Sequence, residues 1–350
     1  MSNLKLYEQL SNLSGIAGHE KAVRKFMREH LQNSDEIIQD KLGGIFGVYN
    51  GTENDVTIMI AAHMDEIGMM VVGITEQGFI RIMPIGGINP EVMVSQNVEI
   101  IVNEEKKIKG IVGAMPPHIS KDNKIDFETM LLDIGADNKE AAIKMGVKIG
   151  QQVTPVNNFY VTEDGKKIVG KAWDDRIGCA MVLEIAEEIK KINHKAKVIL
   201  GGTVQEEVGL RGATVASNMV LPDMFIAIDV SPVGDFLSPS HPKAIGKLGD
   251  GFLVRYFDPR CIMNEKVKEY FENLAEENNI KYQYFKSSGG TDAAAAQYAG
   301  DGAIATTIGV PGRYIHTTAT MVHLEDLENV KKMALAVIAD FSKERKAELI

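Results

Sequence analysis

The sequence feature that most constrains the fold is an alternation of apolar runs with amphipathic segments in the second half of the chain. The runs have the length of fully buried strands, and the segments between them repeat apolar residues at helical spacing. We expect strands at 197–205, 224–231 and 303–310, and helices at 174–191, at 265–279 and from 325 to about 346. This alternation predicts an α/β fold whose sheet is covered by helices on both faces.

The first part of the chain continues the same pattern. The segment from Ala22 to Leu31 places its apolar residues on one face of a helix. Two apolar runs follow at 45–50 and 56–62, separated by the turn-forming residues NGTEND. We therefore expect two strands joined by a hairpin or a short loop.

Between about Gly68 and Thr162 the pattern changes to short β-rich runs separated by Gly, Pro and charged turns, and only NKEAAIKMG looks helical. This pattern is typical of a small β-barrel or sandwich. The simplest organisation is an α/β domain split by an insertion. We expect its first part at 1–67, the inserted β-rich domain at 68–164 and the second part at 165–350.

Charge and composition exclude several classes of partner. Thirty-eight basic against 48 acidic residues give a formal net charge of −10, which disfavours nucleic acids and anionic membranes. No apolar run approaches the roughly 18 residues of a membrane-spanning helix, and the N-terminus lacks the pattern of a secretory signal. Two cysteines cannot form a disulfide framework, so we expect a cytoplasmic protein.

Polar residues at strand ends and helix starts are the candidates for chemistry. His63 and Asp65 follow the run 56–62 and share a face in an extended segment, so the carboxylate can orient the ring while the other ring nitrogen binds a metal. The alternative is a hydrogen-bonded histidine at a polar strand end. Asp174 and Asp175 open a predicted helix, where an acid is either a ligand or a helix cap.

A second group of candidates follows the later strands. Glu206 and Glu207 are adjacent, so their side chains point apart, and one can coordinate a metal while the other takes a proton. The alternative is a solvated charge pair. Asp229 ends an apolar strand as a ligand or a turn former, and His316 follows a short apolar stretch. Together these positions offer the two histidines and the carboxylates that suit two zinc-like divalent ions.

Six sequence blocks carry a family resemblance: AAHMDEIG, KAWDDRIGC, VQEEVGLRGA, AIDVSP, GGTDAA and RYIHTTATMV. In this order and over nearly the whole chain, they resemble the M42 family of metallo-aminopeptidases, most of all the glutamyl aminopeptidase branch of lactic-acid bacteria and their relatives. The resemblance implies a phosphorylase/hydrolase-like zinc peptidase domain, with a central mixed sheet and an inserted β domain. It also implies dimers that assemble into a tetrahedral homo-dodecamer through the inserted domain.

The resemblance also implies roles for individual residues. Asp174 is expected to bridge two ions, one held also by His63 and Asp229 and the other also by Glu207 and His316. Glu206 is the expected general base, Asp65 orients His63, and Asp175 supports the site behind the ligands. An unusual peptide linkage is expected between Asp174 and Asp175. The segment Gly289, Gly290, Thr291 and Asp292 is expected to line the substrate cleft.

The function implied is an aminopeptidase that uses two divalent ions per subunit, zinc or cobalt, and removes acidic residues from peptide N-termini. Arg255 is the first candidate for holding the acidic side chain, with an ion pair to Asp258 as the alternative; Arg313 and Lys247 are weaker candidates. A neutral or leucyl preference is the alternative specificity. Other classes are a carboxylate-based glycoside hydrolase, which leaves His63 and His316 unexplained, and a non-enzymatic assembly protein.

Overall fold

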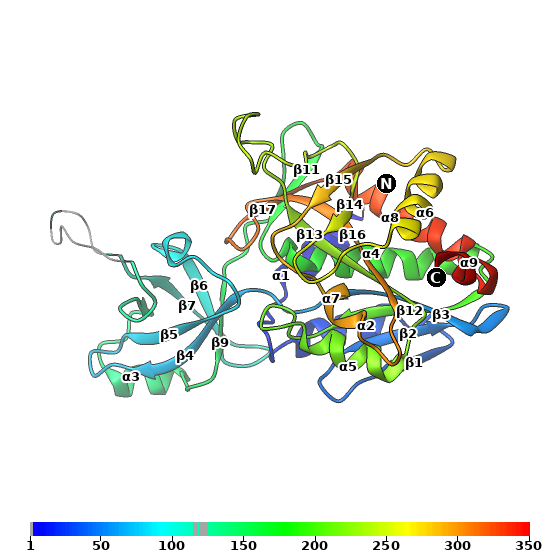
Figure 1. Cartoon of the computed structure of the whole chain (residues 1–350). Helices are drawn as coiled ribbons and strands as arrows, with labels where there is room; N and C mark the ends of the chain where they lie inside the picture. Colours follow the sequence, from blue (N-terminus) through cyan, green and yellow to red (C-terminus); the bar gives the residue numbers. More distant parts are fainter. Residues whose placement is uncertain (1–2, 115–117, 119–124) are drawn as a thin grey trace.

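The larger of two sheets forms the centre of the molecule. We describe residues 3–114, 118 and 125–350 of a computed structural model (Figure 1). The strands of this sheet are β1 (Glu36–Gln39), β2 (Ile45–Tyr49), β3 (Glu53–His63), β10 (Tyr160–Val161), β11 (Lys167–Gly170), β12 (Ala196–Thr203), β13 (Met224–Pro232), β14 (Phe252–Phe257), β15 (Tyr282–Lys286), β16 (Ile304–Arg313) and β17 (Thr320–His323). Their order is β1-β2-β12-β3-β13-β16-β17-β11-β10, with β14 beside β16 and β15 beside β14. The sheet is mixed, as expected for the fold class.

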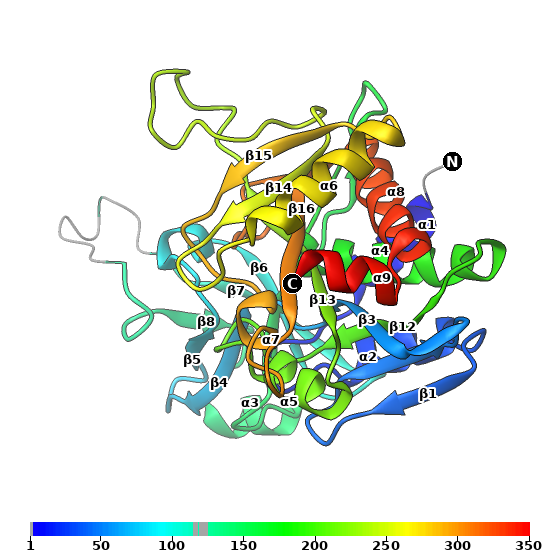
Figure 2. The ribbon, with the colours of Figure 1, turned by 45° about the vertical axis from the view of Figure 1, so that its right-hand side comes forward.

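Helices cover both faces of this sheet because its central strands are apolar on both faces. In β3, Ile58 and Ile60 pack into the core on one face, whereas Met59 and Ala61 pack into the core on the other. The first core contains residues of α1 (Leu4–Asn12), α2 (Lys21–His30), α4 (Trp173–Glu188), the 3-10 turn η2 (Ile189–Lys191), α6 (Glu265–Glu277), α8 (Leu324–Asp340) and α9 (Lys343–Leu349). The second contains residues of α5 (Arg211–Val220) and α7 (Ala293–Ala296) (Figure 2). Among the helices of the described residues, none has the length and apolar character needed to cross a bilayer.

The structure decides two local expectations: of the hairpin and the short loop it has the short loop, and the single last helix is wrong. The strands β2 and β3 are joined by the short loop 50–52 but form no hairpin, because β12 lies between them, antiparallel to β2 and parallel to β3. The last helix is two helices, since α8 ends at Asp340 and α9 begins after Ser342, whose hydroxyl accepts a hydrogen bond from Arg345 N at 3.2 Å. Serine at this position is a preferred N-cap, so it starts a new helix.

The second sheet is a closed barrel, which confirms the inserted β fold. Its strands are β4 (Gly68–Ile74), β5 (Ile80–Ile85), β6 (Asn97–Ile101), β7 (Lys107–Val112), β8 (Leu131–Asp133) and β9 (Gln152–Pro155), in the order β4-β5-β8-β7-β6-β9. Alternate residues such as Met69 and Val71 fill the interior, together with residues of the 3-10 turn η1 (Pro90–Met93) and α3 (Lys139–Met145). The barrel lies beside the large sheet (Figure 1).

Candidate metal centre

The predicted ligands meet at one edge of the large sheet. Strands β3, β12, β13 and β16 are parallel, so their carboxyl ends lie along the same edge. His63 ends β3, Glu206 and Glu207 follow β12, and Asp229 lies near the end of β13. The loop after β16 adds His316, and the start of α4 adds Asp174.

Two groups of three side chains form at this edge, and Asp174 belongs to both. In His63, Asp174 and Asp229 the candidate ligand atoms lie within 4.8 Å of one another, as they do in Asp174, Glu207 and His316. His63 Nε2 lies 3.0 Å from Asp174 Oδ1, whereas His316 Nε2 lies 3.3 Å from Asp174 Oδ2. The two oxygens of one carboxylate therefore face two different groups, which is the geometry of a bridging ligand.

The histidine rings are oriented by backbone carbonyls. His63 Nδ1 lies 3.1 Å from Asp65 O, and His316 Nδ1 lies 2.8 Å from Gly87 O. A carbonyl oxygen only accepts, so Nδ1–H is the donor in both rings. Nε2 of each ring faces the carboxylates, so that loss of its proton leaves a lone pair placed to bind a metal.

Asp65 organises the site through its carboxylate as well as its carbonyl. The carboxylate accepts hydrogen bonds from Glu206 N at 3.0 Å and Glu207 N at 3.2 Å, and lies 3.5 Å from His63 Nδ1. The sequence pointed to the contact with His63 but not to the two backbone amides. Asp65 thus fixes the loop that carries both glutamates relative to His63.

Asp175 lies outside both groups. Its carboxylate accepts hydrogen bonds from His63 N at 3.2 Å and Gly178 N at 3.1 Å, so it anchors the end of β3 to the start of α4. The peptide bond between Asp174 and Asp175 is cis.

Electrostatics show that the donor set fits divalent cations. Burial, followed by the charge of Asp174, raises the pKa of Asp229 to about 7 and that of Glu207 to about 8. Burial also opposes ionisation of Asp174, but hydrogen bonds from His316 and His63 outweigh it and lower the pKa of Asp174. Among the described residues, the buried Glu207 Oε1 has no hydrogen-bond partner. Divalent cations would offset this crowding of carboxylates.

Glu206 is placed differently from the other acids. It belongs to neither group, and its Oε2 lies 3.9 Å from His63 Nε2. Burial raises the pKa of Glu206 well above its usual value, and the nearby charge of Asp229 adds to this. The side chain lines a cavity of about 440 Å³ together with Asp174, Asp229 and His316. A carboxylate here can reach a proton beside any ion held by the two groups.

The segment 289–292 contributes to this cavity only in part. Gly289 and Gly290 line it. Thr291 and Asp292 are buried behind it, where Thr291 Oγ1 lies 2.8 Å from the hydroxyl of Thr307 and Asp292 accepts a hydrogen bond from Thr203. Thr291 and Asp292 therefore support the wall rather than form it.

Of the three candidate cations, Arg255 alone lines the cavity. It is buried, and its guanidinium donates to Ser231 Oγ at 3.3 Å and to Gly289 O, while Nε lies 3.4 Å from Asp258 Oδ2. The alternative ion pair with Asp258 is therefore present.

The two weaker candidates are paired elsewhere. Arg313 Nε and Nη2 each lie 2.7 Å from an oxygen of Asp235, and Lys247 Nζ lies 3.0 Å from Asp250.

The sequence did not reveal that the barrel reaches the site. Gly87, between β5 and η1, supplies the carbonyl that holds His316, and a β-carbon on Gly86 would lie 3.2 Å from Glu207 Oε2. The only sequence signal is the glycine pair in PIGGINP, which by itself indicates a turn. A backbone carbonyl carries no residue-specific signal.

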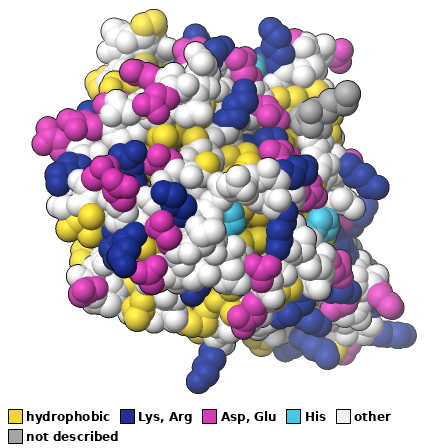
Figure 3. Space-filling model, turned by 90° about the vertical axis from the view of Figure 1, so that its right-hand side faces the viewer, with side chains coloured by type: hydrophobic (Ala, Val, Ile, Leu, Met, Phe, Trp, Pro, Cys, Tyr) yellow, Lys and Arg dark blue, Asp and Glu magenta, His cyan; other side chains and the backbone are white. Residues whose placement is uncertain are grey.

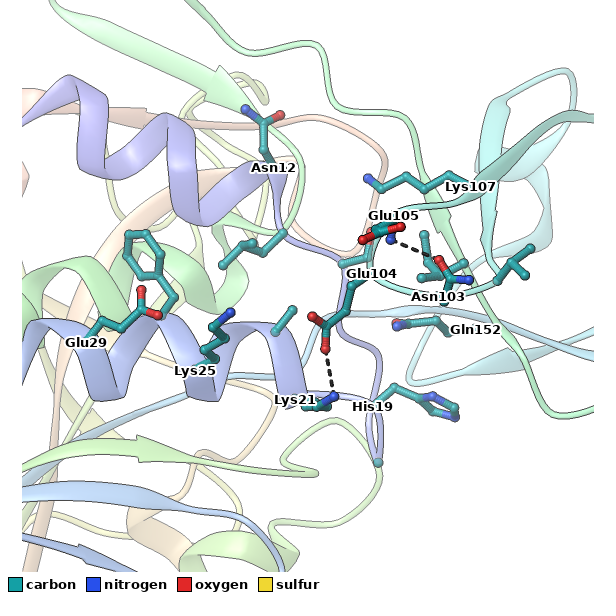
Figure 4. Close-up of a pocket in the computed structure, with 17 residues that line it drawn as sticks. Asn12, His19, Lys21, Lys25, Glu29, Asn103, Glu104, Glu105, Lys107 and Gln152 are labelled. Carbon is teal, nitrogen blue, oxygen red and sulfur yellow. Dashed lines mark hydrogen bonds and ion pairs between the residues drawn. The ribbon is translucent and has the colours of Figure 1, made fainter.

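A larger cavity, of about 880 Å³, lies elsewhere, between α1–α2 and the β6–β7 part of the barrel (Figure 4). None of the expected ligands lines it. Lys21 and Glu104 form a 2.7 Å ion pair across it, but both side chains are mostly exposed, so the pair contributes little energy. Size alone does not locate the chemistry here.

Comparison with known proteins agrees with this geometry. A profile of the M42 glutamyl aminopeptidase family matches residues 43–333. The chain is 35% identical to a glutamyl aminopeptidase of Lactococcus lactis, over 97% of both chains, and 30% identical to a lysyl aminopeptidase of Pyrococcus furiosus, over 97% of this chain and 98% of the relative.

A solved structure agrees as well. The TET1 peptidase of Pyrococcus horikoshii, described as able to assemble into a tetrahedron or a large octahedral shell, superposes with a TM-score of 0.87 at 30% identity, over 97% of this chain and 100% of that one. The chain therefore belongs to the M42 family of metal-dependent aminopeptidases.

Proposed function

We propose that this aminopeptidase holds two divalent ions per subunit, zinc or cobalt, with Asp174 as the bridge. His63 and Asp229 complete one site, and Glu207 and His316 complete the other. The observation that carries the proposal is the divergence of the two Asp174 oxygens toward two histidine Nε2 atoms, at 3.0 and 3.3 Å. A carboxylate-based glycosidase needs neither histidine.

Two such ions supply Lewis-acid chemistry, lowering the pKa of water and polarising the scissile carbonyl. Glu206 accepts the proton of the attacking water and delivers it to the leaving nitrogen. Asp65 keeps Glu206 in place through the backbone bond at 3.0 Å. Asp175 supports the site by holding the backbone of His63.

The preferred substrates in this proposal are peptides with an N-terminal Glu or Asp. Two divalent ions offset the four carboxylates that line the cavity, and the buried Arg255 then adds a positive charge. That charge attracts an acidic side chain and repels a lysyl one. Because Arg255 also holds Gly289, it positions the cavity wall as well. The relative with a lysyl preference makes this specificity a matter for experiment.

We also propose that the barrel is an assembly domain, that subunits form dimers within a tetrahedral dodecamer, and that the enzyme works in the cytoplasm. The TET1 peptidase supports the assembly. Both cysteines are free and buried, which suits a reducing compartment.

The test measures metal content and activity on the same samples. Dialysis against zinc or cobalt should give two ions per chain, and excess chelator should abolish hydrolysis of Glu-p-nitroanilide. Wild type should prefer Glu- over Leu- and Lys-p-nitroanilide. Arg255→Leu should weaken that preference by about 2–4 kcal/mol. Full activity in excess chelator excludes the metal mechanism. If Arg255→Leu loses activity equally on all three substrates, Arg255 does not bind the acidic side chain and acts only by holding Gly289.

A further inference from the structure

A second cavity of about 310 Å³ adjoins the first at the two glutamates, and we call the two cavities the first and second lobes. The lobes share Glu206 and Glu207, but Asp174, Asp229 and His316 line the first lobe alone. Leu210, Pro259 and Arg260 line only the second lobe. The proposed metal ligands thus lie mainly on one side of Glu206, and a different surface lies on the other.

The position of Glu206 gives a peptide its direction in this cavity, if the proposed function holds. The N-terminal residue lies with the ions in the first lobe. Glu206 delivers a proton to the leaving nitrogen, so this nitrogen lies beside Glu206. The residue that follows the scissile bond therefore extends into the second lobe.

Arg260 has a fixed backbone and an unpaired guanidinium. The buried Asp258 accepts hydrogen bonds through Oδ1 from Arg260 N at 2.7 Å and Cys261 N at 2.8 Å, and Gln297 Nε2 donates to Arg260 O at 2.6 Å. A β-carbon on Gly290 would lie 3.2 Å from Arg260 Cδ, so the arginine stem runs along the cavity wall. Within the described part of the chain, no acceptor pairs with this guanidinium.

Arg255 and Arg260 differ in the partners of their guanidinium groups, and this difference suggests a role for Arg260. The Arg255 guanidinium is buried and contacts Ser231, Gly289 and Asp258, whereas that of Arg260 is exposed and has no partner among the described residues. A free guanidinium matches a carboxylate with two parallel hydrogen bonds. We propose that Arg260 binds a carboxylate of the residue after the scissile bond, either the C-terminal carboxylate of a dipeptide or an acidic side chain.

The experiment compares substrates that differ only in this carboxylate. With the metal-loaded enzyme, kcat/KM is measured for Glu-Ala, Glu-Ala-amide and Glu-Asp-amide, and Glu-p-nitroanilide serves as a substrate without any second residue. Wild type should favour Glu-Ala, Glu-Asp-amide or both over Glu-Ala-amide by about two- to fivefold, the size of an accessible ion pair. Preference for Glu-Ala alone identifies the terminal carboxylate, and preference for Glu-Asp-amide alone identifies the side chain.

Two variants and a control assign the preference to Arg260. Arg260→Gln should abolish the preference and leave the metal content unchanged, while Arg260→Lys should retain part of the preference. Arg81→Gln, which removes an exposed arginine from the barrel, should retain all of it. Equal wild-type rates on the three dipeptides, or a preference that survives in Arg260→Gln, overturn the proposal. If the metal-loaded enzyme hydrolyses neither Glu-p-nitroanilide nor Leu-p-nitroanilide, the proposed function is overturned instead.

Discussion

At the scale of the residue, the site depends on carboxylates that each serve more than one partner. The Asp174 carboxylate faces two histidines, and that of Asp65 accepts from two backbone amides and lies 3.5 Å from His63 Nδ1. The two adjacent glutamates take different positions, since Glu207 belongs to one of the two candidate ligand groups and Glu206 belongs to neither. The types of residue at these positions were readable from the sequence, because polar side chains at the ends of buried strands are costly without a partner.

This separation predicts different phenotypes for two nearly identical changes. Glu206→Gln should keep both ions and lose about 10²–10⁴-fold in kcat, because it removes only the proton acceptor. Glu207→Gln should lose an ion, because it removes a ligand. Metal analysis beside steady-state kinetics distinguishes the two, and equal metal contents in the two variants contradict the assignment.

A buried charge cluster behind the site predicts a stability effect. Glu66 accepts hydrogen bonds from Lys171 Nζ at 2.8 and 2.6 Å and from Arg176 Nη2 at 3.2 Å, with all three side chains buried. Glu66→Gln leaves two cations without a counter-charge and should lower the free energy of unfolding by about 3–5 kcal/mol.

Chemical denaturation of the metal-free protein measures this loss. Glu104→Gln, which breaks the exposed pair with Lys21, is the matched control and should cost about 1 kcal/mol or less. If the two variants lose similar free energies of unfolding, the buried cluster does not contribute the expected stability.

The raised pKa values of the ligands predict coupling between protons and metal. Without ions, Asp229 and Glu207 titrate at about 7 and about 8 because of burial. A divalent ion binds the deprotonated carboxylates, so binding releases protons and the apparent affinity rises with pH through this range. Titration calorimetry with zinc in buffers of different ionisation enthalpy measures the release, which should shrink in Glu207→Gln. Affinity independent of pH here speaks against these residues as ligands.

At the scale of the element, most helices and strands follow from local patterns, but their neighbours do not. Apolar runs predicted the central strands because buried strands need apolar residues on both faces. The sequence left a hairpin or a short loop open between β2 and β3, because turn-forming residues do not decide which strands pair, and β12 lies between the two strands. The loop 86–87 reaches His316 by tertiary packing alone.

This loop predicts an effect of the barrel on the metal site. Gly86 has φ +84°, and a β-carbon would lie 2.9 Å from Ile67 Cγ2 and 3.2 Å from Glu207 Oε2. Gly86→Ala should displace the loop and weaken binding of the second ion by about 10–100-fold. Gly135→Ala is the control, because Gly135 also has positive φ, +72°, but no atom within 4 Å of the added carbon. Equal metal affinity in the two variants would show that the loop does not contribute to metal binding.

At the scale of the whole molecule, the barrel has two surfaces of different character. One reaches the metal centre through Gly87, and another presents apolar side chains to solvent, including Val72 and Met83, 42% and 43% exposed. The face of the molecule in Figure 3 mixes acidic and basic side chains rather than separating them. Such a mixture gives no extended surface of one sign there for a nucleic acid.

The exposed apolar side chains of the barrel predict a contact between subunits. The double change Val72→Glu and Met83→Glu should reduce the particle mass, because charges are depleted from the buried core of an interface. Leu42→Glu, at an equally exposed position of 42% outside the barrel, should leave the mass unchanged. Light scattering measures both, and an unchanged mass in the double variant contradicts the assembly role of this surface.

The sequence by itself determined the α/β class, the β-rich insertion and the residue types placed at strand ends, because periodicity and burial of apolar residues act locally. Tertiary structure alone decided which strands are neighbours and that Gly87 O holds His316 across 229 residues. It also decided that Arg255 is engaged, whereas Arg260 has no partner in the part of the chain that the structure describes. These features depend on contacts between segments that are distant in the sequence, and some depend on backbone atoms. Backbone atoms are the same in every residue, so such contacts leave no pattern in the sequence.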